Sequence, residues 1–301
     1  MQKRIGFAGL GLMGSRMAAQ LLAKGFPLMV WNRTPERCAP LRDKGATVAD
    51  TPRELAEACD VVVACVADPN AVGRVVFSDD GIRPAARPGF RYLEASTISP
   101  GLARRVAEAL RARGADMLEA PMTGSKLGAE KGTLLFMTGG APEVHEELMP
   151  VMMAMGTRAI HCGEVGQASV VKLIGNTVIS FMLEGLCEGL AVADRAGVDA
   201  QKLIDVIQAS GYASPYYPFK GGQIARRDWD THFSIDLMVK DQGLMLEEAE
   251  RHRVPMPGLA AIREVFQAAR AQGWGGEDIA AVYKAVDIRP GSTPAPVPEV
   301  R

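Results

Sequence analysis

Short apolar runs alternate with helical patterns through the first half of the chain. The runs have the length and β-branched content of strands, and some are apolar throughout, as in strands covered on both faces. They lie at residues 4–8, 27–31, 60–66, 92–95, 117–120 and 133–138. Helix starts are marked by Thr34-Pro35, by the capping-box sequence Thr51-Pro52-Arg53-Glu54 and by Ser99-Pro100. This alternation predicts an α/β domain with a parallel sheet and right-handed crossovers.

The pattern changes at about residue 163, where strand signals end and long apolar-periodic helices begin. These helices are expected at residues 167–196, 200–208, 237–252 and 257–272. The chain is therefore predicted to have an α/β domain over residues 1–163 and an all-helical domain over 164–288. The proline-rich tail at 289–301 has few apolar residues and is predicted to be disordered.

Composition and charge argue against several classes of function. The 34 basic and 35 acidic residues leave a net charge of −1, so we expect no binding to nucleic acid or to an anionic membrane. The most apolar stretch, 170–192, carries Lys172, Asn176, Glu184 and Glu188, which favours a buried helix over a membrane span. Five cysteines without a CxxC pair and four histidines without ligand spacing predict reduced thiols and no metal site. Because no secretory signal precedes the first strand, a cytoplasmic location is expected.

A glycine-rich turn follows the first predicted strand and opens the first helix. It reads Gly9-Leu10-Gly11-Leu12-Met13-Gly14. Gly9 allows the tight turn, Gly11 lets the backbone approach a pyrophosphate, and Gly14 permits close packing of the helix on the strand. The N–H groups and the positive dipole end near Leu12 and Met13 favour an anion. This context predicts a dinucleotide-binding Rossmann domain, with these five residues at the cofactor.

The end of the second strand discriminates between the two nicotinamide cofactors. NAD enzymes usually place a carboxylate there, which accepts hydrogen bonds from the ribose hydroxyls. This chain has Asn32-Arg33-Thr34 instead. Arg33 is suited to pairing with a 2′-phosphate, and Asn32 and Thr34 are suited to donating hydrogen bonds to it. We therefore expect NADPH in preference to NADH.

Reduction of a carbonyl by a nicotinamide requires a proton donor and groups that hold the substrate against the ring. Residues 96–100 present hydroxyls directly after the strand at 92–95, and residues 119–126 form a hydroxyl- and glycine-rich turn suited to a carboxylate. Lys172 and Asn176 are four residues apart and so share one face of the long helix. An ammonium within so apolar a helix needs water, a partner or a cleft.

In their order and spacing, these motifs resemble those of the β-hydroxyacid dehydrogenase family, which is related to 3-hydroxyisobutyrate dehydrogenase. The resemblance extends to residue 287 and rests on the glycine turn, Asn-Arg-Thr, Ser96-Thr97, the Pro121–Ser125 segment and Lys172-xxx-Asn176. Within the family, the chain is most similar to the NADPH-dependent glyoxylate and succinic semialdehyde reductases. The resemblance implies hydride transfer between NADPH and a small carboxylate-bearing aldehyde or 2-oxo acid.

The resemblance also implies roles for the matching residues. Lys172 would be the catalytic acid/base, and Asn176 would orient the substrate or Lys172. The substrate carboxylate would be held by Ser96, Thr123 and Gly124. Further cofactor contacts would come from Val66, Ala67, Thr97, Phe233 and Lys240, the last two in a segment ending at Asp241 that closes over the cofactor.

One departure from the family pattern leaves the substrate open. Many members have Ser-Gly-Gly where this chain has Thr123-Gly124-Ser125, followed by Lys126. Ser125 restricts the backbone and adds a hydroxyl, and Lys126 adds a charge. Action on 3-hydroxyisobutyrate or tartronate semialdehyde therefore stays an alternative. A non-catalytic NADPH-binding sensor or scaffold is an alternative of another class, and imine reduction is a third; an intact Lys172 disfavours both.

The long helix at 167–196 also bears on assembly. Its apolar residues surround the helix and do not form a single stripe, which is unusual for a helix with one face in water. We therefore expect a homo-oligomer, either a dimer or a tetramer.

Overall fold

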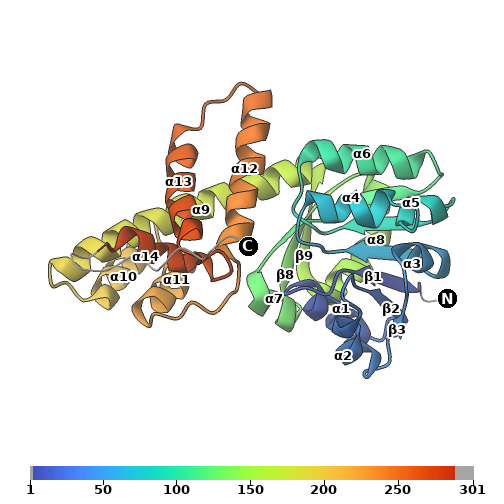
Figure 1. The fold of residues 1–301 in the computed structure, drawn as a ribbon, viewed down its shortest axis with the longest axis horizontal. Helices are drawn as coiled ribbons and strands as arrows, with labels where there is room; N and C mark the ends of the chain where they lie inside the picture. The colour runs from blue at the N-terminus through green and yellow to red at the C-terminus, as the bar shows by residue number, and fades with distance from the viewer. Residues whose placement is uncertain (1–2, 289–301) are drawn as a thin grey trace. The chain divides into compact units, whose positions relative to one another are not determined.

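The computed structural model describes residues 3–288, so the tail predicted to be disordered lies outside the described residues. The chain forms two compact units that divide between Leu173 and Ile174, inside helix α9 (Gln167–Arg195) (Figure 1). The first unit contains the sheet and the helices that cover it, and the second unit is helical.

The first unit is built on one sheet with the strand order β3-β2-β1-β4-β5-β6-β8-β7, and β9 pairs with β8. Strands β1 to β6 pair in parallel, which confirms the predicted α/β arrangement. β8 departs from the prediction of a parallel sheet, because it runs antiparallel to β6 and β7 after the short helix α7 (Ser125–Lys131) turns the chain back. The strands are β1 (Ile5–Ala8), β2 (Leu28–Trp31), β3 (Thr47–Val48), β4 (Val61–Ala64), β5 (Arg91–Glu94), β6 (Asp116–Glu119), β7 (Met122–Thr123), β8 (Leu134–Gly139) and β9 (Gly156–Gly163).

Helices cover both faces of this sheet, and Figure 1 shows the three layers. Because strand residues alternate between the faces, Phe7 packs with α1 (Gly14–Ala23) and α8 (Pro142–Met155), whereas the neighbouring Ala8 packs on the opposite side. The opposite face is covered by α3 (Pro52–Ala58), α4 (Pro69–Phe77), α5 (Ile82–Ala85) and α6 (Pro100–Arg111). The central strand β4 is buried along its whole length, which explains its unbroken apolar sequence.

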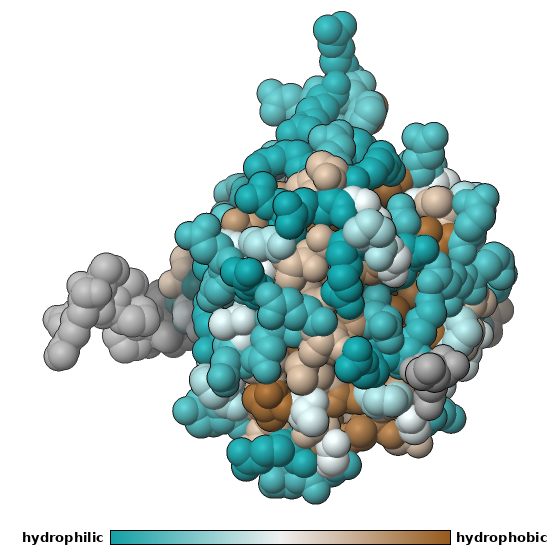
Figure 2. All heavy atoms as spheres, turned by 90° about the vertical axis from the view of Figure 1, so that its right-hand side faces the viewer, coloured by the Kyte–Doolittle hydropathy of each residue, from teal (hydrophilic) through white to brown (hydrophobic). Residues whose placement is uncertain are grey.

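The surface of the first unit is mostly polar where Figure 2 displays it. Hydrophilic side chains dominate that face, and apolar side chains reach the surface in scattered places between them. The large apolar side chains lie instead in the two clusters on either side of the sheet. The sheet is therefore buried on both faces, as its sequence pattern predicts.

Helix starts in the first unit follow the predicted caps at two of three places. The Thr51 hydroxyl accepts a hydrogen bond from the Glu54 amide at 3.1 Å, and Ser99 caps α6 through the Leu102 amide at 3.2 Å. Thr34 differs, because its side chain makes no capping bond. The chain there forms a short 3₁₀ turn, η1 (Pro35–Cys38), followed by α2 (Ala39–Arg42). The carbonyl of Thr34 instead accepts a hydrogen bond from Asn32.

The second unit confirms the predicted all-helical region. Its core is built around Leu183, Leu190, Met238 and Phe266. Three further helices start within two residues of their predicted positions, and the helix α11 (Tyr216–Ala225) was not predicted. The elements after α9 are α10 (Ala200–Ala209), α11, α12 (Ile235–Arg251), α13 (Pro257–Ala271), η2 (Ile279–Val282) and α14 (Tyr283–Val286).

Helix α9 is the one described helix that is long and apolar enough to cross a membrane by length and composition. Two of its buried polar side chains have partners on α12. Asn176 donates to Asp241 at 2.5 Å, and Ser180 accepts from Gln242 at 3.2 Å. Such paired polar groups are typical of a helix in a protein core.

Candidate active site

The glycine turn has the geometry of a dinucleotide cradle. Gly9 has φ +100°, and a Cβ there would overlap the carbonyl oxygen of Cys65. A Cβ at Gly14 would overlap the carbonyl oxygen of Gly9, so α1 sits directly on the turn. Gly11 is different, because, apart from Gly11 itself and its two chain neighbours, no heavy atom of the described residues lies within 4 Å of the place where its Cβ would be. The backbone at Gly11 is therefore open to a ligand, while Gly9 and Gly14 are required by the fold.

The residues after β2 lie beside this turn. The Asn32 side-chain oxygen accepts a hydrogen bond from the Leu10 amide at 2.8 Å, and its nitrogen donates to the Thr34 carbonyl at 2.9 Å. Asn32 therefore ties the end of β2 to the glycine turn, a task that the sequence did not reveal. Arg33 is exposed, and its guanidinium makes no hydrogen bond or ion pair with any residue between 3 and 288. It is available to an anion beside the turn.

A chain of hydrogen bonds links the loops after β4 and β5. The Val66 amide donates to the Ser96 hydroxyl at 2.9 Å, and the Ser96 amide donates to Glu94 Oε1 at 2.8 Å. The Tyr92 hydroxyl donates to Glu94 Oε2 at 2.8 Å. Burial raises the pKa of Glu94 to about 7, although the hydrogen bonds from Ser96 and Tyr92 lower it. Ser96 is nearly fully buried, and its hydroxyl holds the Val66 amide. Ala67 and Thr97 are more accessible to solvent.

Glu119 ends β6, next to Glu94 in the sheet register. Its carboxylate accepts hydrogen bonds from the amides of Gly166 and Ala168 and from the Ser169 hydroxyl, all at 2.7–2.8 Å. Burial raises the pKa of Glu119, while these hydrogen bonds act to lower it. The first turn of α9 is therefore attached to the carboxyl end of β6. Lys172 follows one turn later, partly buried and still within the first unit.

The segment after β6 adopts an unusual backbone. Thr123 is exposed at the end of β7, Gly124 has φ +132°, and Ser125 has φ +58°. The left-handed region suits glycine better than serine, so Ser125 stores backbone strain at the start of α7. The family pattern described above would place glycine here, and glycine would adopt this conformation freely.

The second unit contains the other predicted residues. Asp241 is buried, and its carboxylate accepts from Asn176 at 2.5 Å and pairs with the Lys240 ammonium at 2.8 Å. The unit thus brings Asn176 and Lys240 together through Asp241. Half-buried Phe233 packs against the core of this unit, and its amide donates to Asp278 at 3.2 Å. Asp278 is itself buried and paired with Lys220 at 2.6 Å, which holds the Phe233 loop in place.

Sequence reasoning missed the buried anchors Glu94, Glu119, Lys220 and Asp278. Glu94 and Glu119 could have been recognised from the sequence, because each is an ionisable residue within a predicted apolar strand. A carboxylate in that position needs donors, and neighbouring loops supply them. Lys220 and Asp278 carried no such signal, because 57 residues separate them along a helical region.

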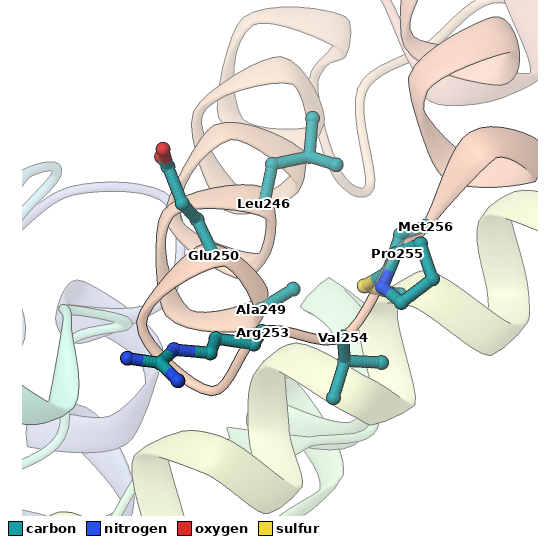
Figure 3. A pocket seen from close by; sticks show the side chains of 7 residues that line it. All are labelled: Leu246, Ala249, Glu250, Arg253, Val254, Pro255 and Met256. Atoms are coloured by element: carbon teal, nitrogen blue, oxygen red, sulfur yellow. The ribbon is translucent and has the colours of Figure 1, made fainter.

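A shallow hollow of about 360 Å³ lies on the second unit, at the connection between α12 and α13 (Figure 3). Leu246 and Ala249 line it from α12, and Val254, Pro255 and Met256 line it from the connection. None of the predicted site residues contributes to it.

Residues 3–288 contain no group of three or more histidine, cysteine or acidic side chains that could hold a metal ion. The five cysteines are free thiols. The open backbone at Gly11, the exposed Arg33 and the start of α1 do fit a dinucleotide with a phosphorylated ribose.

Comparison with known proteins shows which protein family the chain belongs to. The family model for the NAD binding domain of 6-phosphogluconate dehydrogenase matches residues 4–164, and the one for the NAD-binding domain of NADP-dependent 3-hydroxyisobutyrate dehydrogenase matches residues 166–286. Glyoxylate/succinic semialdehyde reductase 1 of Arabidopsis thaliana is 34% identical over 94% of this chain and 98% of its own length. The chain belongs to the 3-hydroxyisobutyrate dehydrogenase family. It is an NAD(P)-dependent hydroxyacid dehydrogenase or reductase with an N-terminal Rossmann domain.

Two solved structures and one further relative are similar to this chain over most of its length. The structure of 3-hydroxyisobutyrate dehydrogenase from Mycobacterium tuberculosis has a TM-score of 0.87 at 28% identity and covers 96% of this chain and all of its own. The structure of Psf3 in complex with NADP⁺ and 2-OPP has a TM-score of 0.86 at 26% identity, covering 94% of this chain and 99% of that one. Human cytokine-like nuclear factor N-PAC is 34% identical over 94% of this chain, which spans about half of N-PAC's length.

Proposed function

We propose that the chain is an NADPH-dependent reductase of small carboxylate-bearing aldehydes or 2-oxo acids, such as glyoxylate or succinic semialdehyde. One observation carries the proposal: a single compact unit holds the glycine cradle, the hydroxyl-bearing loops after β5 and β6, and the part of α9 with Lys172. The cofactor turn, the loops proposed to hold the substrate carboxylate and the proposed proton donor thus belong to one compact unit. The similarity to the Arabidopsis reductase and to an NADP⁺-bound structure supports the same function.

The nicotinamide, when bound, supplies the hydride that adds to the carbonyl carbon. The amides near Gly11, Leu12 and Met13 hold the pyrophosphate, with Val66, Ala67 and Thr97 along the dinucleotide. Thr123 and Gly124 hold the substrate carboxylate through a hydroxyl and a backbone amide. Ser96 contributes indirectly: its hydroxyl accepts a hydrogen bond from the Val66 amide and so holds the loop after β4.

Proton donation falls to Lys172. As negative charge develops on the carbonyl oxygen, the Lys172 ammonium gives up one proton, so that the product is a hydroxy acid and the lysine is left neutral. Asn176 is proposed to orient the substrate or this amine, and Asp241 fixes its amide group. Phe233 and Lys240 remain predicted cofactor contacts.

A paired assay with NADPH and NADH tests the function. The panel contains glyoxylate, succinic semialdehyde, tartronate semialdehyde and methylmalonate semialdehyde, with oxidation of 3-hydroxyisobutyrate as the reverse reaction. We expect oxidation of NADPH with glyoxylate or succinic semialdehyde. Consumption of a cyclic imine without any aldehyde activity would contradict the proposal.

Replacing Arg33 by alanine is expected to weaken NADPH binding by about 10–100-fold, because charge-assisted hydrogen bonds to a phosphate each contribute about 1.5–3 kcal/mol. NADH has no 2′-phosphate, so its Kd should change less than twofold. The measurement is a fluorescence titration of both cofactors. Arg37, exposed on the following turn, provides the control substitution. Equal weakening of both cofactors would remove Arg33 from its assigned role.

A second candidate function is suggested by the N-PAC relatives, which are named as cytokine-like nuclear factors and not as oxidoreductases. This chain would then bind NADPH as a sensor or scaffold. Tight NADPH binding together with no turnover over the whole carbonyl panel would favour that reading.

We also propose that the chain forms a homo-oligomer through the second-unit part of α9. Ile174, Val178, Phe181 and Val192 are 46–68% exposed there and recur at spacings that keep them on one side of the helix. Val178→Glu is expected to shift the sedimentation coefficient towards the monomer, because it would bury a charge in the contact. Val206→Glu on α10, at a valine that is also more than half exposed but lies outside this stripe, is the control. A wild-type chain that sediments as a monomer at micromolar concentration would exclude the contact.

A further inference from the structure

Glu119 caps the N-terminus of α9 from a distant strand. One oxygen, Oε1, accepts from the amides of Gly166 at 2.7 Å and Ala168 at 2.8 Å, and the other, Oε2, accepts from the Ser169 hydroxyl at 2.7 Å. The first amides of any helix have no partner within the helix, so they need acceptors from elsewhere. Here the acceptor comes from a strand 47 residues earlier in the chain, and the Glu119 side chain is 1% exposed.

The surroundings of this carboxylate are shaped to admit it. Gly139 on β8 pairs with Glu119, and a Cβ at Gly139 would overlap Glu119 Oε1. Gly166 has φ +103°, and a Cβ there would overlap the guanidinium of Arg104 on α6. Two glycines therefore leave room for the carboxylate and for the turn that meets it. An ordinary strand end would need neither.

Lys172 follows this cap closely. Ser169 precedes Lys172 by three residues, which is less than one helical turn and about 4.5 Å along the axis. The cap and Lys172 both lie in the unit that ends at Leu173, so their relation is internal to one compact body. A lysine side chain is flexible because it has four rotatable bonds. The position of its ammonium is therefore defined only if the helix backbone that carries it is fixed.

We propose that Glu119 is a positioning residue for the reaction: its carboxylate fixes the first turn of α9 and thereby the place from which Lys172 donates its proton. The inference rests on the proposed role of Lys172. Glu119 does not touch the substrate, and its effect is transmitted through the α9 backbone.

Substitution of Glu119 separates this role from general stabilisation. Glu119→Ala is expected to lower kcat for reduction by about 10–100-fold while the Kd of NADPH stays within twofold, because the glycine cradle does not involve Glu119. Glu119→Gln should restore kcat to within about fivefold of wild type. Its amide oxygen accepts both backbone amides, and its NH₂ group donates to the Ser169 hydroxyl. Glu108→Gln, at an exposed position on α6, is the matched control.

Hydrogen exchange gives a readout that does not depend on activity. The backbone amides of residues 166–172 should exchange faster in Glu119→Ala, and wild-type protection should return in Glu119→Gln. If Glu119→Ala does not fold, Gly139→Ala provides a second route, because the added methyl group displaces the carboxylate without removing it.

The outcomes are distinct. Unchanged exchange at 166–172, or losses of kcat and NADPH affinity in equal proportion, would overturn the positioning role. If the wild-type chain reduces no carbonyl compound, the proposed function fails. Exchange at 166–172 would then still decide whether Glu119 fixes the start of α9.

Discussion

Replacing Lys172 by alanine is expected to lower kcat by about 10²–10⁴-fold, the range that a positioned general acid contributes. Without an ammonium, the developing alkoxide must take its proton from water. Cofactor binding should survive, because none of the contacts assigned to the dinucleotide comes from Lys172. The expected signature is therefore a loss of turnover at an unchanged Kd for NADPH.

Two further variants sharpen this test. Lys172→Arg keeps the charge, but a guanidinium does not release its proton near neutral pH, so it should not restore turnover. Lys131→Ala removes an exposed lysine at the end of α7 in the same unit and should leave kcat unchanged. Turnover is measured with saturating NADPH and succinic semialdehyde or glyoxylate. A Lys172→Ala variant with near-wild-type turnover would take the proton-donor role away from this residue.

The second prediction concerns the glycine turn, where two similar substitutions should change different properties: one the affinity for NADPH, the other the Tm of the protein. Gly11→Ala should weaken NADPH binding by about 10–100-fold with little change in Tm, because its methyl group enters open space that the pyrophosphate would occupy. Gly14→Ala should lower the Tm of the cofactor-free protein by roughly 3–10 °C, because its methyl group would overlap the Gly9 carbonyl and force α1 away from the turn.

Both effects are measured on the same samples. Calorimetric titration gives the Kd of NADPH, and thermal unfolding without cofactor gives Tm. Gly73→Ala provides the control, because a Cβ at this helical glycine of α4 also meets open space. A Gly11→Ala variant that loses Tm but binds NADPH normally would show that Gly11 serves the fold instead of the cofactor.

Local patterns in the sequence were sufficient to predict much of the fold. The apolar run at 60–66 predicted a strand buried on both faces, and the structure has β4 there. The caps at Thr51 and Ser99 predicted helix starts, because a side-chain acceptor three residues before an amide acts within one turn. Strand β9 was missed because only one of its eight residues is buried and its burial does not alternate along the strand. Helix α11 was missed because its first turn reads Tyr-Tyr-Pro-Phe, which has neither a capping residue nor helical periodicity.

The candidate residues were also found from local sequence, but their partners were not. The strand–turn–helix pattern located Gly9, Gly11 and Gly14, and the four-residue spacing placed Lys172 and Asn176 on one helix face. No sequence pattern indicated that the Asn32 side chain accepts a hydrogen bond from the Leu10 amide, or that Asp241 on another helix accepts one from Asn176. Ser96 was assigned to the substrate carboxylate, and the structure shows that its hydroxyl accepts a hydrogen bond from the Val66 amide.

By itself, the sequence determined strands β1, β2, β4, β5, β6 and β8, the glycine cradle and the lysine-bearing helix, because the periodicity and capping that specify them act over a few residues. Only the tertiary structure decided how buried charges are satisfied: that Glu94 holds Ser96, that Glu119 holds the start of α9, and that Lys220 meets Asp278. The Glu119 and Lys220 contacts join residues about 50 or more positions apart. Which donor meets which buried acceptor at that separation depends on the path of the chain through the sheet and the helices, and no local pattern records that path.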